Sequence, residues 1–262
     1  KWKNNTILID TWKKFNDDCP QFIQSTIGRY CQYQIKNCSW QGEHGWQKQL
    51  LAWEKQVCDI IMQESVYSEG TVAKCCVESI DEGGKLFIGN SMPIRDVDMF
   101  SLTSSKKIHI YSNRGASGID GIISSALGMC NNSNNKNSLL LIGDVSFYHD
   151  MNGLLASRYG ANLTIVVINN SGGGIFSFLP IANSGLENFQ QYWTTDTDLK
   201  INKVTDLYNC KYYFAENLNE VKKSIRESFK YKGVQIIEVK TSISKNISAH
   251  KRMLEKVKLA LI

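Results

Sequence analysis

The sequence predicts an α/β fold in which a parallel sheet carries helices on both faces. Short apolar runs at residues 139–142 and 163–168 are each followed by a polar or glycine-rich cluster. The segment between them is long enough for one helix, and strand, helix, strand in this order is typical of a parallel sheet. Two earlier apolar runs, at residues 85–89 and 108–111, end in similar clusters. We therefore expect four of the strands to present polar residues at one edge of the sheet.

The composition is that of an ordinary globular protein with one large or two small domains. The chain has 262 residues, of which 42% are hydrophobic and 21% charged, and its net charge is +5. The lysine-rich patches at residues 106–107 and 222–232 contain too few aromatic residues for a nucleic-acid surface, so solvated helix faces are favoured. There is no apolar run long enough to span a bilayer and no signal peptide. We expect neither a membrane span nor a nucleic-acid partner, and a location in the cytoplasm, or in the plastid stroma if the chain comes from an alga or plant.

The cysteines do not indicate a zinc site. None of the eight forms a C-x-x-C pair, which is the spacing that most structural zinc sites contain. Free, partly buried thiols in a reducing compartment are the simplest interpretation.

The first part of the chain has little regular pattern. Residues 1–40 look irregular, with a short strand at residues 6–9 as the one expected element. Apolar residues then recur at spacings of three and four between residues 44 and 65, which predicts an amphipathic helix. Glu69 and Gly70 interrupt this pattern, and a second helix is expected at residues 72–80.

From residue 85 the pattern alternates between strands and helices. After the four strands named above, a last strand is expected at residues 234–239. Residues 181–202 lack clear periodicity, and we expect a loop or lid there. The helices predicted in this region cover residues 119–129, 150–159, 204–210, 218–229 and 247–262.

Gly143 and Asp144 follow the strand at residues 139–142. A glycine allows the backbone to approach a phosphate closely, and the Asp144 carboxylate could bind a cation. Val145 and Ser146 could offer backbone N–H groups to a phosphate at the start of the next helix. The alternative is that Asp144 and Ser146 only cap that helix.

A second polar cluster follows the strand at residues 163–168. It consists of Asn169, Asn170, Ser171 and three glycines, which is more than a plain turn requires. Because the carboxyl ends of parallel strands share one edge, this cluster should meet Asp144. Carboxylate, amide and backbone oxygens suit Mg²⁺, which commonly binds together with phosphate groups.

The order Gly-Asp, crossover, Asn-Asn resembles the diphosphate-binding signature of thiamine diphosphate (ThDP) enzymes. Three further sequence motifs are similar to those of one family of ThDP enzymes, the MenD family. Its members are 2-succinyl-5-enolpyruvyl-6-hydroxy-3-cyclohexene-1-carboxylate (SEPHCHC) synthases, which act in menaquinone and phylloquinone synthesis. The motifs are GNSMPIRD at residues 89–96, SNRGASGIDG at residues 112–121 and GGGIFSFLP at residues 172–180. The resemblance is dense from about residue 72 to residue 180 and thin elsewhere.

The resemblance implies a domain organisation and a cofactor site. Residues 71–262 would form the ThDP diphosphate-binding domain, and residues 1–70 the end of a middle domain with a connecting helix. Asp144, Asn170 and the Gly172 carbonyl would hold Mg²⁺ or Mn²⁺. Ser171 departs from the Asn or Asp that is usual at its position, which is not expected to be a ligand. The other residues expected at the cofactor are Ser91, Ser117, Ile119, Gly143, Val145 and Ser146.

The family's substrates, 2-oxoglutarate and isochorismate, are both dicarboxylates. Guanidinium groups bind carboxylates through paired hydrogen bonds, so the resemblance implies that Arg95 and Arg114 contact substrate. The alternative is that each arginine pairs with a nearby acid. Phe176 and Leu179 would form an apolar wall of the site, although such residues by themselves fit a core equally well. None of the four histidines receives a role.

The resemblance implies a ThDP- and metal-dependent transferase that decarboxylates 2-oxoglutarate and adds the resulting four-carbon unit to isochorismate. In this family the site lies between two subunits of a homodimer and needs a glutamate from a pyrimidine-binding domain. We find no such domain in this sequence, so we assign no catalytic residue and expect the chain to be inactive by itself. Two alternatives remain: another ThDP-dependent 2-oxoacid decarboxylase, or a non-catalytic cofactor-binding remnant.

Overall fold

The computed structural model describes residues 6–12, 19–39, 45–102, 105–113, 115–130 and 137–261. The chain divides into two compact units, residues 1–52 and residues 53–262. In the described parts of the chain, no helix is long and apolar enough to cross a membrane.

The first unit contains a small parallel sheet and a helix. Strand β1 (Ile7–Asp10) pairs with β2 (Gln21–Gln24), and helix α1 (Ile27–Asn37) follows. The expected strand at residues 6–9 is confirmed as β1, whereas β2 and α1 were missed. Helix α1 was missed although Ile27, Cys31 and Ile35 recur at a helical spacing of four; none of its residues is buried. Helix α2 (Trp46–Gln63) crosses from the first unit into the second, close to its predicted bounds.

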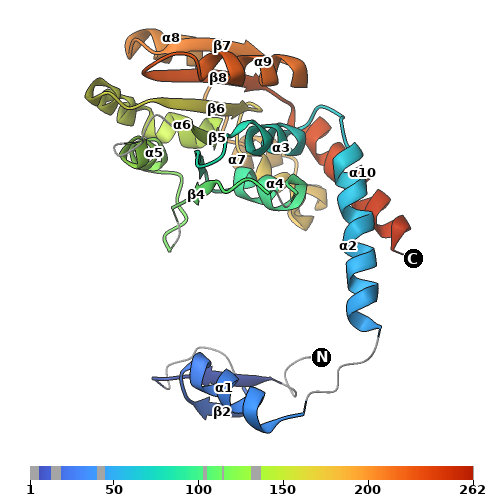
Figure 1. The fold of residues 1–262 in the computed structure, drawn as a ribbon. Coiled ribbons are helices and arrows are strands. Elements are labelled where there is room, and N and C mark those ends of the chain that lie inside the picture. The colour runs from blue at the N-terminus through green and yellow to red at the C-terminus, as the bar shows by residue number, and fades with distance from the viewer. Residues whose placement is uncertain are drawn as a thin grey trace. The chain divides into compact units, whose positions relative to one another are not determined.

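The second unit is built on a six-stranded sheet in which every neighbouring pair is parallel (Figure 1). The strand order is β4-β3-β5-β6-β8-β7. The expected α/β class is therefore confirmed. The strands are β3 (Lys85–Ile88), β4 (His109–Tyr111), β5 (Ser138–Gly143), β6 (Leu163–Asn169), β7 (Lys211–Ala215) and β8 (Val234–Lys240).

The central strands are buried on both sides because each face of the sheet carries its own layer of helices. Leu140 and Ile142 of β5 belong to one apolar cluster, and Leu139 and Leu141 belong to the other. The first cluster contains residues of α5 (Ile122–Cys130), α6 (Asp144–Asp150), the 3₁₀ helix η2 (Met151–Tyr159) and α8 (Ile201–Leu207). The second contains residues of α3 (Glu69–Ser79), α4 (Met92–Phe100) and α9 (Leu218–Ser228).

Several elements differ from the prediction. Helix α6 begins at Asp144, directly at the polar cluster, and the 3₁₀ helix η2 covers the predicted helix at residues 150–159. Strand β7 and helix α4 were not predicted. β7 is an edge strand that pairs only with β8 and buries only Ala215 fully, so its residues show little apolar alternation. The last helix, α10 (Ile243–Ala260), begins earlier than expected.

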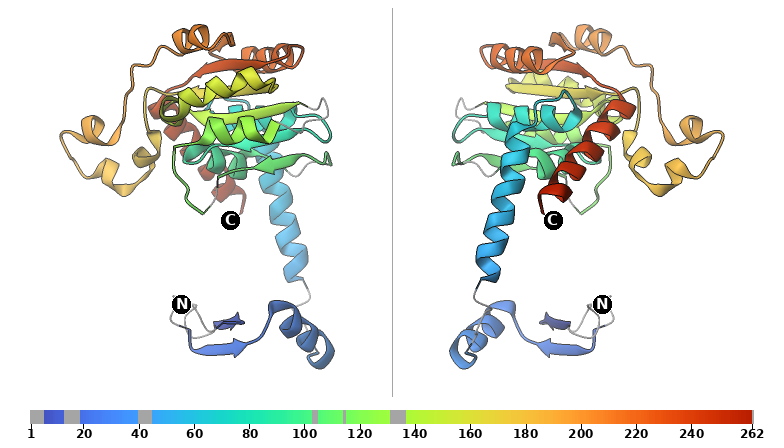
Figure 2. Two further views of the ribbon diagram at one scale, coloured as in Figure 1. Left: turned by 90° about the vertical axis from the view of Figure 1, so that its left-hand side faces the viewer. Right: turned by 90° about the vertical axis from the view of Figure 1, so that its right-hand side faces the viewer.

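The segment between β6 and α8 stands out from the sheet as a separate lobe, gold to orange in Figure 2. It contains the short helices η3 (Gly174–Phe178), η4 (Pro180–Asn183) and α7 (Phe189–Trp193). The stretch that lacked periodicity is therefore partly helical, in short turns that bury no residue fully in η4 or α7.

Helices α3 and α4 approach closely at Gly70. A Cβ added there would clash with the ring of Phe100, which is only 1% exposed. We expect Gly70→Ala to lower the free energy of unfolding by about 1–3 kcal/mol through overpacking, measured by urea denaturation. Gly128→Ala in α5 is the matched control, because a Cβ there has no neighbour within 4 Å. The control should be neutral or stabilising by up to about 1 kcal/mol, and equal effects of the two changes would contradict this explanation.

Candidate functional site

The four polar clusters meet because β4, β3, β5 and β6 are neighbours in the sheet. A cavity of about 300 Å³ lies at their carboxyl ends, which is where ligands bind in open α/β sheets. Nine of the predicted site residues line it: Ser91, Ile119, Gly143, Asp144, Val145, Ser146, Asn170, Gly172 and Phe176.

Asp144 is a buried carboxylate at the first position of α6, with only 6% of the residue exposed. Its Oδ1 accepts a hydrogen bond from the Val145 N–H at 2.8 Å, and its Oδ2 accepts one from the Gly172 N–H at 2.9 Å. Burial raises the pKa of Asp144 to about 6, although these N–H groups lower it. No cationic side chain in the described part of the chain forms an ion pair with it. A bound cation would supply the missing countercharge.

Asn170 offers an oxygen at the same cavity. Its Nδ2 donates to Glu69 Oε1 at 2.8 Å, whereas its Oδ1 is buried and has no hydrogen-bond partner among the described residues. An unpaired buried acceptor costs about 1–3 kcal/mol, and a metal ion bound to it would remove this cost. The donor set therefore fits a hard cation such as Mg²⁺.

Gly172 connects the two proposed side-chain ligands. Its φ of +129° lies in a region that other residues rarely adopt, and a Cβ would lie 2.8 Å from Thr194 Cγ2. Glycine is thus required for the backbone N–H of residue 172 to reach Asp144. Among the described residues there is no group of three or more His, Cys, Asp or Glu that could hold a metal. The proposed set of one carboxylate, one amide and one carbonyl is of a different kind.

The residues proposed to hold the diphosphate also line the cavity. Gly143, Val145 and Ser146 surround the start of α6, where backbone N–H groups lack intrahelical acceptors. Ser91 has a φ of +72° at the turn from β3 into α4. Such a conformation costs about 1–3 kcal/mol in a residue other than glycine and is typical of functional sites.

The loop before α5 is placed only in part. Ile119 lines the cavity, whereas Ser117 is exposed and does not. Asn90 joins this loop to the site, since its Nδ2 donates to the Gly118 carbonyl at 2.7 Å. Sequence analysis assigns Asn90 no separate role, although it lies within the GNSMPIRD motif. Its buried Oδ1 has no partner among the described residues.

The proposed substrate residues are less well placed. Arg95 is exposed and does not line the cavity; its Nη1 donates to the Ser91 carbonyl at 2.6 Å. Arg114 lies outside the described residues. Phe176 lines the cavity and contacts Trp193 edge to face, with ring centroids 5.1 Å apart. Leu179 is 46% exposed and lies outside the cavity lining.

Glu69 and Trp193 also line the cavity, and sequence analysis assigned neither to the site. Glu69, the first residue of α3, is 2% exposed, and burial raises its pKa to about 7. A capping pattern of Ser68 and Thr71 could have placed the helix start, but it does not show that Glu69 reaches Asn170. Trp193 comes from the predicted loop or lid, so that stretch does contribute to the wall of the site.

His250 has a structural position that the sequence did not indicate. Its Nε2 lies 2.7 Å from Asp96 Oδ1 and its Nδ1 lies 3.0 Å from the Asn246 carbonyl oxygen. Both partners offer acceptor oxygens, so the protonated ring can donate a hydrogen bond from each nitrogen. Burial lowers the pKa of His250, but the hydrogen bond and charge of Asp96 outweigh it and raise the pKa. The ring also contacts Phe100 and Phe178 edge to face.

The pairing of Asp96 with His250 bears on the alternative that Arg95 forms an ion pair with a nearby acid. Among the described residues, Asp96 forms an ion pair with His250 and none with Arg95. Asp96 lies on α4, Phe178 on η3 and His250 on α10. The pair therefore joins α4 to α10, and the contact of the His250 ring with Phe178 links them to η3; α4 and η3 both contribute to the wall of the cavity.

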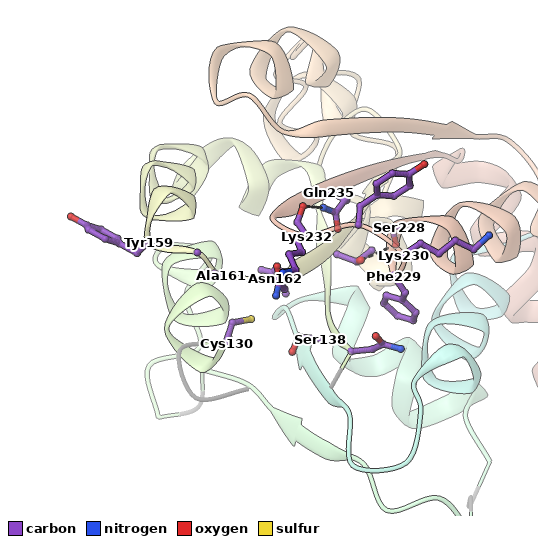
Figure 3. A pocket seen from close by; sticks show the side chains of 15 residues that line it. Cys130, Ser138, Tyr159, Ala161, Asn162, Ser228, Phe229, Lys230, Lys232 and Gln235 are labelled. Carbon is purple, nitrogen blue, oxygen red and sulfur yellow. Dashed lines mark hydrogen bonds between the residues drawn. The ribbon is translucent and has the colours of Figure 1, made fainter. Parts of the chain in front are cut away.

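A larger cavity of about 390 Å³ lies at the opposite, amino-terminal edge of the sheet (Figure 3). Its lining includes Ser138 and Leu163, the first residues of β5 and β6, together with Lys230 and Lys232. Among the described residues that line it there is no carboxylate, so these residues lack the charged ligand that a hard cation prefers. The smaller cavity is the better candidate despite its size, because the buried carboxylate and the unpaired amide oxygen are there.

Comparison with known proteins places the chain in a family. Residues 98–239 match the family described as "Thiamine pyrophosphate enzyme, C-terminal TPP binding domain"; thiamine pyrophosphate is ThDP. The solved structure of benzoylformate decarboxylase from Polynucleobacter necessarius superposes with a TM-score of 0.54 at 19% sequence identity, over 66% of this chain and 33% of that one. This likeness supports the fold alone.

Curated relatives are more similar in sequence. A protein of Listeria innocua is 41% identical over 82% of this chain, and one of Oceanobacillus iheyensis is 42% identical over 76%. A Bacillus cytotoxicus protein is 34% identical over 94% of the chain. All three are named 2-succinyl-5-enolpyruvyl-6-hydroxy-3-cyclohexene-1-carboxylate synthase, and the chain spans 38%, 34% and 43% of their respective lengths. The match to residues 98–239 shows that this chain belongs to the thiamine pyrophosphate enzymes and carries their C-terminal cofactor-binding domain.

Proposed function

We propose that this chain provides the ThDP diphosphate- and metal-binding part of a SEPHCHC synthase. In this reaction 2-oxoglutarate is decarboxylated and the resulting four-carbon unit is added to isochorismate, a step of menaquinone or phylloquinone synthesis. The names of the three relatives support this assignment. The observation that carries it is the pairing of a buried, uncompensated Asp144 carboxylate with the unpartnered Asn170 Oδ1 at one cavity.

The residues have separate roles in this proposal. Asp144, Asn170 and the Gly172 carbonyl hold Mg²⁺ or Mn²⁺, and the backbone around Ser91 and Gly143–Ser146 receives the diphosphate. Ile119 supports the thiamine, and Ser117 is assigned to it through the family resemblance alone. When bound, ThDP supplies the electron sink that decarboxylation of a 2-oxo acid requires. The chain's own residues anchor it and exclude water from its apolar side.

The substrate contacts are proposed on charge and position. Arg95 and Arg114 would bind the carboxylates of the two substrates, and Phe176 with Leu179 would form an apolar wall. Arg95 lies one helical turn from Ser91 and already donates to its carbonyl, so its guanidinium is held near the start of α4. Phe176 is 38% exposed and lines the cavity, as a residue that meets substrate must.

The proposal includes partners that the chain itself does not show. The glutamate that activates ThDP would come from a pyrimidine-binding domain, and two subunits would form the complete site as a homodimer. Residues 1–70 would belong to the end of a middle domain and residues 71–262 to the cofactor-binding domain. The relatives named above are bacterial, which favours the bacterial cytoplasm over a plastid.

Calorimetric titration with ThDP tests the proposal. The chain should bind ThDP when Mg²⁺ is present and much more weakly when EDTA removes it, because the cation links the diphosphate to Asp144 and Asn170. When the chain is combined with a pyrimidine-binding domain, CO₂ release from 2-oxoglutarate should depend on isochorismate. Metal-independent binding, or turnover of pyruvate instead of 2-oxoglutarate, would contradict the assignment.

A further inference from the structure

Glu69 is a buried acid with no place in the predicted site. It lies at the start of α3, 101 residues before Asn170 in sequence, and only 2% of it is exposed. Two donors converge on its Oε1: Asn170 Nδ2 at 2.8 Å and Thr241 Oγ1 at 3.0 Å. This oxygen is therefore an acceptor within a fixed network.

The position of Glu69 is held from several sides. Its backbone N–H donates to Asn246 Oδ1 of α10 at 3.2 Å. Ser68 and Thr71 form a reciprocal capping box that defines where α3 begins. The carboxyl group consequently has little freedom to move away from Asn170.

The side-chain amide of an asparagine binds a metal ion only through its oxygen. Its oxygen is a ligand for hard cations, whereas its NH₂ group is a donor and repels them. The acceptor at Glu69 Oε1 selects the orientation in which Nδ2 points to Glu69. The remaining atom, Oδ1, is left buried and without a partner among the described residues.

We infer that Glu69 is a positioning residue for the metal: it holds the Asn170 amide by its nitrogen and thereby presents the oxygen to the cation. The inference rests on the proposed function, because it assigns a role at the same cation site. It adds a residue that contacts the ligand side chain without binding the metal itself. Loss of such an outer partner of a metal ligand typically lowers metal affinity by about 10–100-fold.

Two substitutions separate the hydrogen bond from the charge. Glu69→Met has a similar length but no acceptor, so the Asn170 amide is free to turn. Glu69→Gln keeps an oxygen for Asn170 and removes the charge. With ThDP present, we expect Glu69→Met to weaken Mn²⁺ binding, measured by electron paramagnetic resonance, by about 10–100-fold. Glu69→Gln should bind Mn²⁺ nearly as well as the unmodified chain.

Glu64 provides a matched control. It is another buried glutamate of this unit, but its partners are Arg252 and Lys256, outside the cavity. Glu64→Met should leave Mn²⁺ affinity unchanged even if it lowers stability. If it reduced Mn²⁺ binding as much as Glu69→Met, the loss would reflect destabilisation, and the inference would be wrong.

A second readout needs neither metal nor cofactor. The Asn170 side-chain NH₂ signal in ¹H–¹⁵N spectra, assigned by its loss in Asn170→Asp, should exchange slowly in the unmodified chain and in Glu69→Gln. In Glu69→Met it should exchange faster. An unchanged signal would overturn the inference even if that variant bound metal poorly.

The outcomes distinguish this inference from the proposed function. If the unmodified chain bound no Mn²⁺ with ThDP, the proposed function would fail and the inference with it. If the unmodified chain and Glu69→Met bound Mn²⁺ equally well, only the inference would fail. Equal weakening by Glu69→Gln and Glu69→Met would also overturn it, because it would assign the effect to the charge of Glu69.

Discussion

Asp144→Asn is expected to lower Mn²⁺ affinity in the presence of ThDP by about 100-fold or more. Loss of an outer partner of a metal ligand costs up to about 100-fold, and this change removes a charged ligand itself. The substitution also places an NH₂ group at one of the two carboxylate oxygens. Since both oxygens accept backbone N–H groups, from Val145 and Gly172, one donor would then face another donor.

Asp150→Asn is the matched control for this prediction. Asp150 ends the same helix and also accepts a backbone N–H, that of Ser124 at 2.7 Å, but it lies outside the cavity lining. We expect its substitution to leave Mn²⁺ binding unchanged, measured by the same titration. Unchanged affinity in Asp144→Asn would show that Asp144 caps its helix and does not bind the metal.

His250→Leu is expected to be the most destabilising single change outside the cavity, at about 3–5 kcal/mol. Removing one partner of a buried ion pair leaves the other charge uncompensated, and here Asp96 would remain with a side chain only 3% exposed. The double variant Asp96→Leu with His250→Leu should cost less than His250→Leu alone, because it buries no charge. Urea denaturation of the three variants and the unmodified chain measures these differences.

The exposed His149 serves as the control for this prediction. His149→Leu should change the free energy of unfolding by less than about 0.5 kcal/mol, as most surface substitutions do. A double variant less stable than His250→Leu would contradict the picture of an uncompensated Asp96 and assign the loss to packing against Phe100 and Phe178.

The same pair gives stability a defined dependence on pH. The folded pKa of His250 is raised above its usual value of 6.5, so its contribution is fully present below about pH 6.5 and is lost as the pH rises through the folded pKa. Burial also raises the pKa of Glu69 to about 7 and that of Asp144 to about 6, so their unfavourable contribution develops at lower pH, between about pH 4 and pH 7. The difference between the curves of the unmodified chain and His250→Leu reports on the His250–Asp96 pair, because burial also raises the pKa of Asp96. That difference should shrink as the pH rises from about 7 to about 9.

Local patterns in the sequence were sufficient for much of the second unit. Apolar runs separated by helix-length segments predicted β3, β5, β6 and β8, because a strand buried on both faces needs an unbroken apolar run. The rule that parallel strands end at one edge then brought Asp144 and Asn170 together, and both line the cavity. The weakly buried elements, β2, α1 and β7, lacked such patterns and were missed.

The contacts that shape the candidate site depend on the tertiary structure. Glu69 meets Asn170 across 101 positions, and Asp96 meets His250 across 154 positions. No periodicity links residues so far apart, since each pair is joined by the packing of whole helices against the sheet. Conversely, Ser117 and Leu179 lie in motifs that resemble those of the family, and yet they do not line the cavity. A sequence motif places a residue near the edge of the sheet, but the packing of α3, α4 and α10 determines which side chains contact one another there.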